Sequence, residues 1–169
     1  LHRLGVPSYH VMLNDRRLFN GLARAWGIED QFTDLTVALD KWDKIGNEGV
    51  KKELSERGMG ESTITEVMKL FSLLDQEDSE ERLRGVQKLL LPDDEEAQFA
   101  HQEVKKLMDL AIGSGVPKTC LLFDPTLARG LNYYTGAIFE VRVEGAPVGS
   151  ICGGGRYADL TGIFGWEGM

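Results

Sequence analysis

Residues 127–141 read LARGLNYYTGAIFEV, and this stretch decides the fold at the C-terminal end of the chain. From Tyr133 onward the residues alternate between two faces, as in a β-strand, and Gly136 removes a side chain beside Tyr134. Arg129 precedes the two tyrosines, and a guanidinium at the mouth of a strand is a good donor to a phosphate. The pattern allows two interpretations: a polar substrate pocket, or a structural strand preceded by a solvated arginine.

A second run, CGGGRY at residues 152–157, contains three consecutive glycines. Gly153, Gly154 and Gly155 allow the backbone to approach a ligand closely or to turn sharply. The run lacks the lysine and Ser/Thr of a P-loop, and it lacks the spacing of a dinucleotide fingerprint. On the residues alone, a tight turn and a binding site both remain open.

The rest of the chain places strands at both ends and helices between them. PSYHVMLND alternates apolar residues and predicts a strand, and TCLLFD predicts a short one. From about residue 33 to residue 112 the apolar spacing is helical only. This order predicts an α+β fold in which an all-helical segment interrupts an antiparallel sheet.

Several residues favour particular helix ends. Asn14 or Asp15 can cap a helix that follows the first strand, and Gly27 can end it. Thr63–Glu66 has the spacing of a capping box. Pro92 suits the first position of a later helix.

Charge is distributed unevenly along the 169 residues, whose net charge is −8. Residues 45–112 hold 16 acidic and 9 basic side chains, which disfavours phosphate-driven binding of nucleic acid by this segment. No apolar run approaches the roughly 20 residues needed to cross a bilayer. Cys120 and Cys152 show no pairing pattern, which is typical of a reducing cytoplasm, and the histidines and cysteines do not have metal-ligand spacing.

The two C-terminal runs together resemble the paired signatures of the histidyl-tRNA synthetase family, which belongs to the class II aminoacyl-tRNA synthetases. The usual forms are Arg-Gly-Leu-Asp-Tyr-Tyr-Thr-Gly and Gly-Gly-Arg-Tyr-Asp. LNDRRLFNG, LDKWDKIG and VKKELSERG also resemble stretches of that family, so the resemblance covers about residues 4–167. It implies a partial class II catalytic core formed by residues 1–44 and 118–169, interrupted by a helical insertion domain at residues 45–117.

The resemblance also implies roles for individual residues. Arg129 matches the arginine that contacts the α-phosphate of ATP, where a fixed cation stabilises the charge that develops as the adenylate forms. Tyrosines that line the histidine pocket can hydrogen-bond the imidazole and offer it an aromatic wall, above a floor of glycines. The implied substrate-binding residues are Tyr133, Tyr134, Tyr157, Gly154 and Gly155.

Two positions depart from the family signatures. Asn132 stands where aspartate is commoner, so an ion pair at this position is not expected. Ala158 also replaces a usual aspartate, so a supporting side-chain hydrogen bond is not expected there. Neither departure removes Arg129 or the tyrosines.

For the intact enzyme, the resemblance implies a cytoplasmic homodimer that uses ATP and Mg²⁺ to convert histidine to histidyl-adenylate, then transfers the histidyl group to tRNA(His). The chain lacks an initiator methionine, the three class II motifs and an anticodon-binding domain. We therefore expect a fragment that is inactive alone and binds no cofactor tightly.

Two non-catalytic alternatives share the resemblance: a regulatory subunit of ATP phosphoribosyltransferase, and a synthetase-like domain that senses tRNA. Retention of RGLNYYTG argues against both. The family's insertion domain contacts the tRNA acceptor arm, but in this acidic segment we expect at most a few such basic contacts, because lysines on helix faces are more often solvated. The candidates for such a contact are Lys51, Lys52, Lys105 and Lys106.

Overall fold

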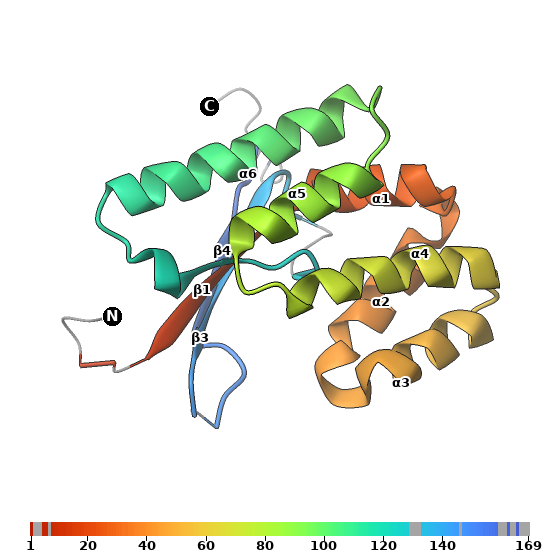
Figure 1. The fold of residues 1–169 in the computed structure, drawn as a ribbon, viewed down its shortest axis with the longest axis horizontal. Helices are drawn as coiled ribbons and strands as arrows, with labels where there is room; N and C mark the ends of the chain where they lie inside the picture. The colour runs from red at the N-terminus through yellow and green to blue at the C-terminus, as the bar shows by residue number, and fades with distance from the viewer. Residues whose placement is uncertain are drawn as a thin grey trace.

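The computed structural model of the chain (Figure 1) describes residues 1, 5, 6, 8–128, 133–145, 147–158, 162 and 165, without the side chains of Asp40 and Asp43. Strands lie at both ends of the chain and helices between them, which confirms the predicted α+β fold. The elements in chain order are β1 (Tyr9–Asp15), α1 (Arg16–Trp26), η2 (Glu29–Gln31), α2 (Phe32–Asp40), α3 (Trp42–Glu56), α4 (Glu61–Ser72), η3 (Leu73–Asp75), α5 (Ser79–Leu89), α6 (Glu95–Gly113), η4 (Lys118–Cys120), β2 (Leu121–Phe123), β3 (Ala137–Val143) and β4 (Cys152–Gly155).

The described strands form one mixed sheet in the order β2-β1-β3-β4. β1 pairs antiparallel with β3, and β3 pairs antiparallel with β4, as predicted. β2 instead runs parallel to β1, with Val11 opposite Leu121. The difference arises because the whole helical segment lies between these two strands and returns the chain to the end where β1 began, which is the connection that a parallel pair requires.

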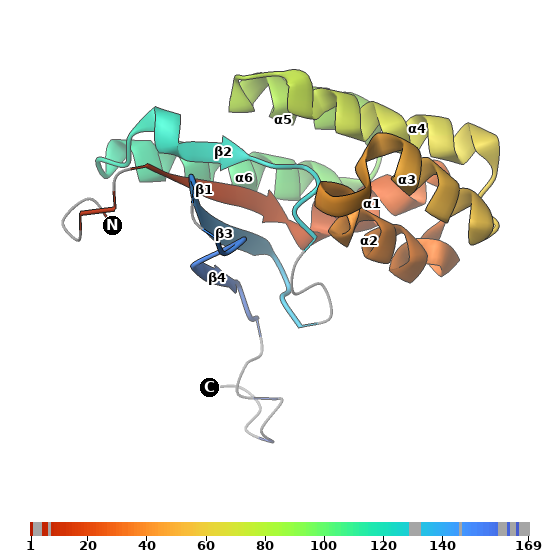
Figure 2. The same ribbon diagram turned by 90° about the horizontal axis from the view of Figure 1, so that it is seen from below.

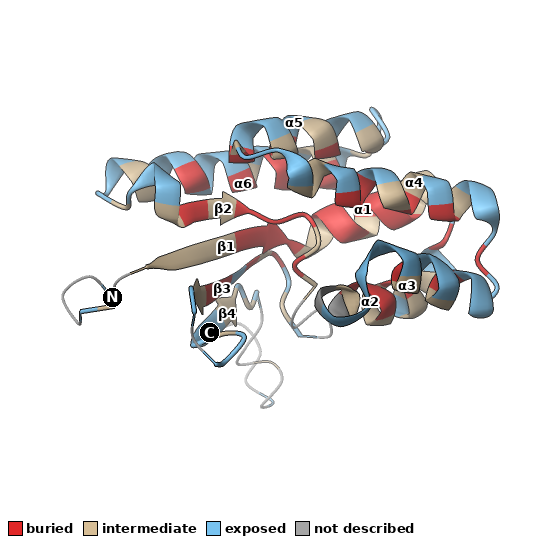
Figure 3. Ribbon diagram, turned by 60° about the horizontal axis from the view of Figure 1, so that its bottom comes forward, coloured by how far each residue is buried: buried red, intermediate tan, exposed pale blue. Residues whose placement is uncertain are grey.

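The helices lie to one side and one end of the sheet, and the β3–β4 hairpin extends away from them (Figure 2). α6 packs on α1 and β1, and α5 packs on β2. Buried residues line β1, β2 and the inner sides of the helices (Figure 3), and one hydrophobic cluster includes Leu13, Leu54, Val104 and Phe123. This cluster joins residues from all three predicted segments, so the domain boundaries at residues 45 and 117 stay a prediction.

α1 begins and ends where the sequence predicts. The side chain of Asp15 accepts a hydrogen bond from the backbone N–H of Arg17 at 2.9 Å and so caps the helix. Gly27 ends the helix with φ of 66°, a left-handed conformation that glycine adopts without steric cost. The cap matters for the site because it fixes the junction between β1 and α1.

Two later helices begin at positions other than the predicted ones. α4 begins at Glu61 after Gly60, which has no side chain to cap it, so the capping box predicted over Thr63–Glu66 lies inside the helix. α6 begins after Asp94, whose carboxylate accepts from the third backbone N–H of the helix. Pro92 therefore lies in the turn before α6, because the aspartate two residues later is the better cap.

Candidate functional site

Three tyrosine rings from the two C-terminal runs gather into one cluster. The rings of Tyr133 and Tyr134 have centroids 4.5 Å apart and meet edge to face. The ring of Tyr157 stacks on Tyr133 at 5.6 Å and meets Tyr134 at 5.2 Å. The alternation predicted that the two adjacent tyrosines would point to opposite faces of a strand. This prediction is wrong, because β3 begins only at Ala137 and both tyrosines precede it. The cluster is an aromatic surface with phenol groups, and Tyr133 is 46% exposed.

The glycine run is neither a turn nor an open loop but part of β4. Gly154 pairs with Phe139, and Gly155 pairs with Ile138. A Cβ atom added at Gly154 would lie 2.5 Å from Cζ of Phe139, and one added at Gly155 would lie 2.5 Å from Cγ of Tyr134. The glycines are therefore needed because aromatic rings lie directly over the strand. Their role as a pocket floor stays a prediction, with Gly155 supporting Tyr134 from beneath.

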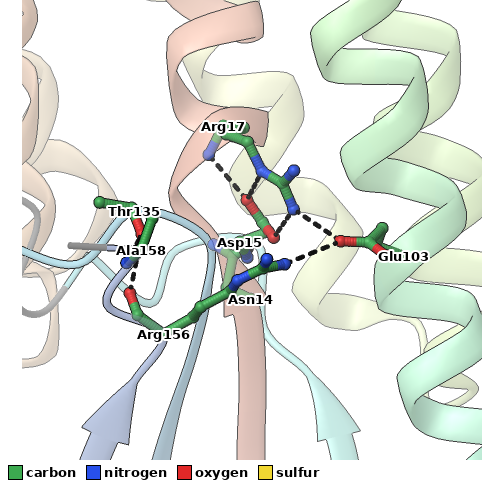
Figure 4. Close-up of polar contacts among 7 residues, drawn as sticks. All are labelled: Asn14, Asp15, Arg17, Glu103, Thr135, Arg156 and Ala158. Atoms are coloured by element: carbon green, nitrogen blue, oxygen red, sulfur yellow. Dashed lines mark hydrogen bonds and ion pairs between the residues drawn. The ribbon is translucent and has the colours of Figure 1, made fainter. Parts of the chain in front are cut away.

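Backbone hydrogen bonds join the two runs (Figure 4). The N–H of Thr135 donates to the carbonyl of Arg156 at 2.8 Å, and the N–H of Arg156 donates to the carbonyl of Ala137 at 2.8 Å. The N–H of Ala158 donates to the hydroxyl of Thr135 at 2.7 Å. This hydrogen bond from the backbone of Ala158 to the side chain of Thr135 ties the second signature to the first, at a position where alanine supplies no polar side chain. Arg129 and Asn132 lie outside the described residues.

The junction of β1 and α1 contributes residues to which the sequence assigned no part in the site. Asn14 is buried, and its side chain donates to the carbonyl of Leu127 at 3.2 Å. Arg16 donates through Nη1 to the carbonyl of Tyr134 at 3.1 Å. Sequence reasoning missed these contacts because both acceptors lie more than a hundred residues away along the chain.

A chain of ion pairs continues from this junction to the second run (Figure 4). The guanidinium of Arg17 donates two hydrogen bonds, of 2.9 and 2.7 Å, to the carboxylate of the fully buried Asp15. This pairing raises the pKa of the Arg17 guanidinium. Glu103 on α6 lies 3.3 Å from Nη2 of Arg17 and 3.4 Å from Nη1 of Arg156. One carboxylate thus bridges the start of α1 to the residue beside Tyr157.

A cleft of about 620 Å³ lies on the same face of the sheet as the ring of Tyr134. The strand register shows that the two share a face. The ring of Tyr134 lies over Gly155, and Gly155 lies opposite Ile138 on β3. Ile138 and Glu140 are two residues apart on β3 and so point to the same side, and Glu140 lines the cleft. Glu140 is buried and pairs with Arg142 at 2.9 Å. The cleft is lined by Leu39, Trp42, Lys44, Asp124, Thr126, Leu127, Ala128, Glu140, Arg142, Gly149 and Ser150.

Within the described part of the chain, no three His, Cys, Asp or Glu side chains lie close enough together to hold a metal ion. No helix among the described residues is long and apolar enough to cross a membrane.

Three of the four candidate lysines, Lys51, Lys52 and Lys105, have acidic neighbours on their own helices. Lys51 pairs with Glu48 at 2.6 Å, and Lys105 pairs with Asp109 at 3.2 Å. Lys52 lies 3.8 Å from an acidic side chain one turn away. These pairs are typical of solvated helix faces, and the contact with tRNA stays a prediction.

The fold is that of an aminoacyl-tRNA synthetase. It matches the crystal structure of histidyl-tRNA synthetase from Nostoc sp. PCC 7120 with a TM-score of 0.86 and 28% identity, over 96% of this chain and 38% of that one. The family model described as Histidyl-tRNA synthetase matches residues 1–168. The histidine–tRNA ligase of Christiangramia forsetii is 43% identical over 169 residues, covering 99% of this chain and 36% of that protein.

The chain therefore belongs to the histidyl-tRNA synthetase family. It spans about a third of the length of the curated relatives it matches: 36% of the Christiangramia forsetii enzyme and 34% of the histidine–tRNA ligase of Flavobacterium johnsoniae. A Bacillus halodurans structure described as an ATP phosphoribosyltransferase regulatory subunit/histidyl-tRNA synthetase has a TM-score of 0.79 at 24% identity, over 98% of this chain and 41% of that one. At that identity, the likeness shows the fold alone.

Proposed function

We propose that this chain is the histidine-recognition segment of a histidine–tRNA ligase. The observation that carries the proposal is the tyrosine cluster, in which Tyr133, Tyr134 and Tyr157 come together from the two signature runs. An imidazole ring offers a flat aromatic face and two nitrogens, and three phenols supply both an aromatic wall and hydrogen-bonding groups. The cluster suits this side chain better than an aliphatic or a strongly charged one.

In the proposed reaction, the carboxylate of histidine attacks the α-phosphate of ATP, pyrophosphate leaves, and histidyl-adenylate forms. The tyrosine cluster holds the imidazole and so orients the histidine carboxylate. Arg129 is proposed to meet the α-phosphate, where a preorganised cation stabilises the developing charge. The histidyl group then passes to the 3′ end of tRNA(His).

The remaining parts of the proposal concern the parent enzyme. We propose a cytoplasmic, homodimeric class II enzyme that binds ATP through residues beyond this segment as well as through Arg129. The family membership and the absence of a membrane-spanning helix among the described residues are consistent with this assignment. Contact between the helical segment and tRNA belongs to the same proposal.

A chimeric ligase tests the function. This chain would replace the matching 36% of the Christiangramia forsetii enzyme, and histidine-dependent exchange of pyrophosphate into ATP would be measured. We expect exchange that is lost in Tyr134→Ala and retained in Tyr9→Ala, the matched control in β1. A folded chimera without histidine-dependent exchange would contradict the proposal and would favour a non-catalytic relative.

A further inference from the structure

Arg16 makes two contacts to the segment that carries the tyrosines. Its backbone N–H donates to the carbonyl of Gly136 at 3.1 Å, and Nη1 of its side chain donates to the carbonyl of Tyr134 at 3.1 Å. Both acceptors lie just before β3 begins at Ala137. One residue at the start of α1 therefore fixes the direction in which the chain enters the strand.

The stability of α1 does not explain an arginine at this position. The Nε atom of Arg16 is buried and has no hydrogen-bond partner among the described residues. A buried donor without an acceptor costs stability. A cation at the positive end of the helix dipole is also unfavourable, and the first turn of α1 holds no acidic residue. The contact that accounts for this side chain is the one with Tyr134.

The residues next to Arg16 in the sequence contact other parts of the site. Asn14 holds the carbonyl of Leu127, and Arg17 is occupied by Asp15 and Glu103. Of the residues in the NDRR stretch, Arg16 is the one that the described contacts connect to the tyrosine segment by a side-chain hydrogen bond. The ring of Tyr134 is then confined between Gly155 beneath it and the two other tyrosine rings.

We propose that Arg16 is a positioning residue of the histidine pocket. It holds the carbonyl of Tyr134, so that the ring of Tyr134 keeps its place in the cluster, and it acts through Tyr134 rather than by touching the substrate. This inference rests on the proposed function for its catalytic consequence. Its structural part stands on the contacts of Arg16 and can be tested without any activity.

Nuclear magnetic resonance of this chain with ring-¹³C-labelled tyrosine tests the structural part. The chain has four tyrosines, of which three form the cluster, so Tyr9 in β1 is an internal reference. We expect Arg16→Met to shift and broaden the signals of the cluster and to leave the signal of Tyr9 unchanged. The melting temperature should stay near that of the wild type, because the substitution also removes the unpaired buried Nε donor of Arg16.

Arg24→Met is the matched control, because it removes an arginine at the far end of α1 whose partner, Asp94 at 2.7 Å, is remote from the tyrosine segment along the chain. It should lower the melting temperature and leave the cluster signals in place. Cluster signals that coincide in Arg16→Met and the wild type would overturn the inference, as would equal changes in both variants.

Kinetics of the chimeric ligase test the catalytic part. We expect Arg16→Met to raise the KM for histidine about tenfold, the size expected when a hydrogen bond from a charged donor is lost, with the KM for ATP unchanged. Arg16→Lys should recover part of the loss, because an ammonium can still donate to the carbonyl. An active wild-type chimera with an unchanged KM in Arg16→Met would refute the inference and leave the proposed function standing. An inactive wild-type chimera would refute the proposed function, and the tyrosine signals would still decide the role of Arg16.

Discussion

Replacing Gly155 by alanine tests why glycines follow Cys152 in β4. The added Cβ would lie 2.5 Å from Cγ of Tyr134 and 2.6 Å from Cδ1 of the same ring. These atoms are the base of the ring rather than its far end, so no rotation about the ring axis relieves the overlap. The ring must move as a whole, away from Gly155 and into the space of Tyr133 and Tyr157.

The magnitude follows from the cost of overpacking. We expect Gly155→Ala to lower the free energy of unfolding by about 2 kcal/mol, within the usual range for one added group in a packed site. Gly154→Ala places its Cβ against Cζ, the far end of the Phe139 ring, which is 40% exposed and can swing outward. Its cost should stay below about 1 kcal/mol. Gly149→Ala meets nothing within 4 Å and should change stability by at most about 0.5 kcal/mol.

Denaturant unfolding of the three variants, combined with the ring-labelled tyrosine spectra, measures both effects. The expected order of cost is Gly155→Ala, then Gly154→Ala, then Gly149→Ala, and only the first should displace the cluster signals. If Gly155→Ala were no more destabilising than Gly149→Ala and left the tyrosine signals unmoved, the ring of Tyr134 would not be what requires glycine in β4.

Two further predictions concern pH. Hydrogen bonds from Arg24 hold the pKa of Asp94 below its usual range, so this carboxylate contributes stability above about pH 4 that is lost as the pH falls further. Asp94→Asn should cost about 1–2 kcal/mol at pH 7 and reduce the loss of stability between pH 5 and 3, measured by urea unfolding. Burial lowers the pKa of His101, with the positive charge of Lys105 adding to the effect, so protonation opposes folding and stability falls as the pH drops below about 6.5. His101→Gln keeps a donor for the carbonyl of Leu83 and should reduce the change of the urea unfolding midpoint between pH 7 and pH 5. A midpoint that changes with pH as much as in the wild type would contradict the assignment.

Local patterns predicted most of the fold. The alternation before Asp15, the cap at Asp15 and the stop at Gly27 depend on residues close together in the sequence, and the structure confirms them. The parallel pairing of β2 could not be predicted in the same way, because it depends on where a long helical crossover returns the chain. Propensity also misled at the glycine run, since glycine weakens a strand unless something occupies the space of its missing side chain.

The signatures predicted residues that lie close together, but not the contacts that support them; their role as a binding site stays a prediction. The signatures identified Tyr133, Tyr134 and Tyr157, and the structure brings all three together. The contact between Arg16 and Tyr134 spans 118 residues, and no local pattern encodes it. The signal that could have pointed to it was an arginine at the positive end of a helix, where the dipole disfavours a cation.

Titration of this chain with histidine, followed through its ring-labelled tyrosines, tests the central claim most directly. We predict that L-histidine shifts the signals of Tyr133, Tyr134 and Tyr157 in a saturable manner, while Tyr9 stays in place and L-lysine at the same concentration has no such effect. Identical spectra with histidine and with lysine, or shifts confined to Tyr9, would contradict the assignment of the tyrosine cluster as a histidine pocket.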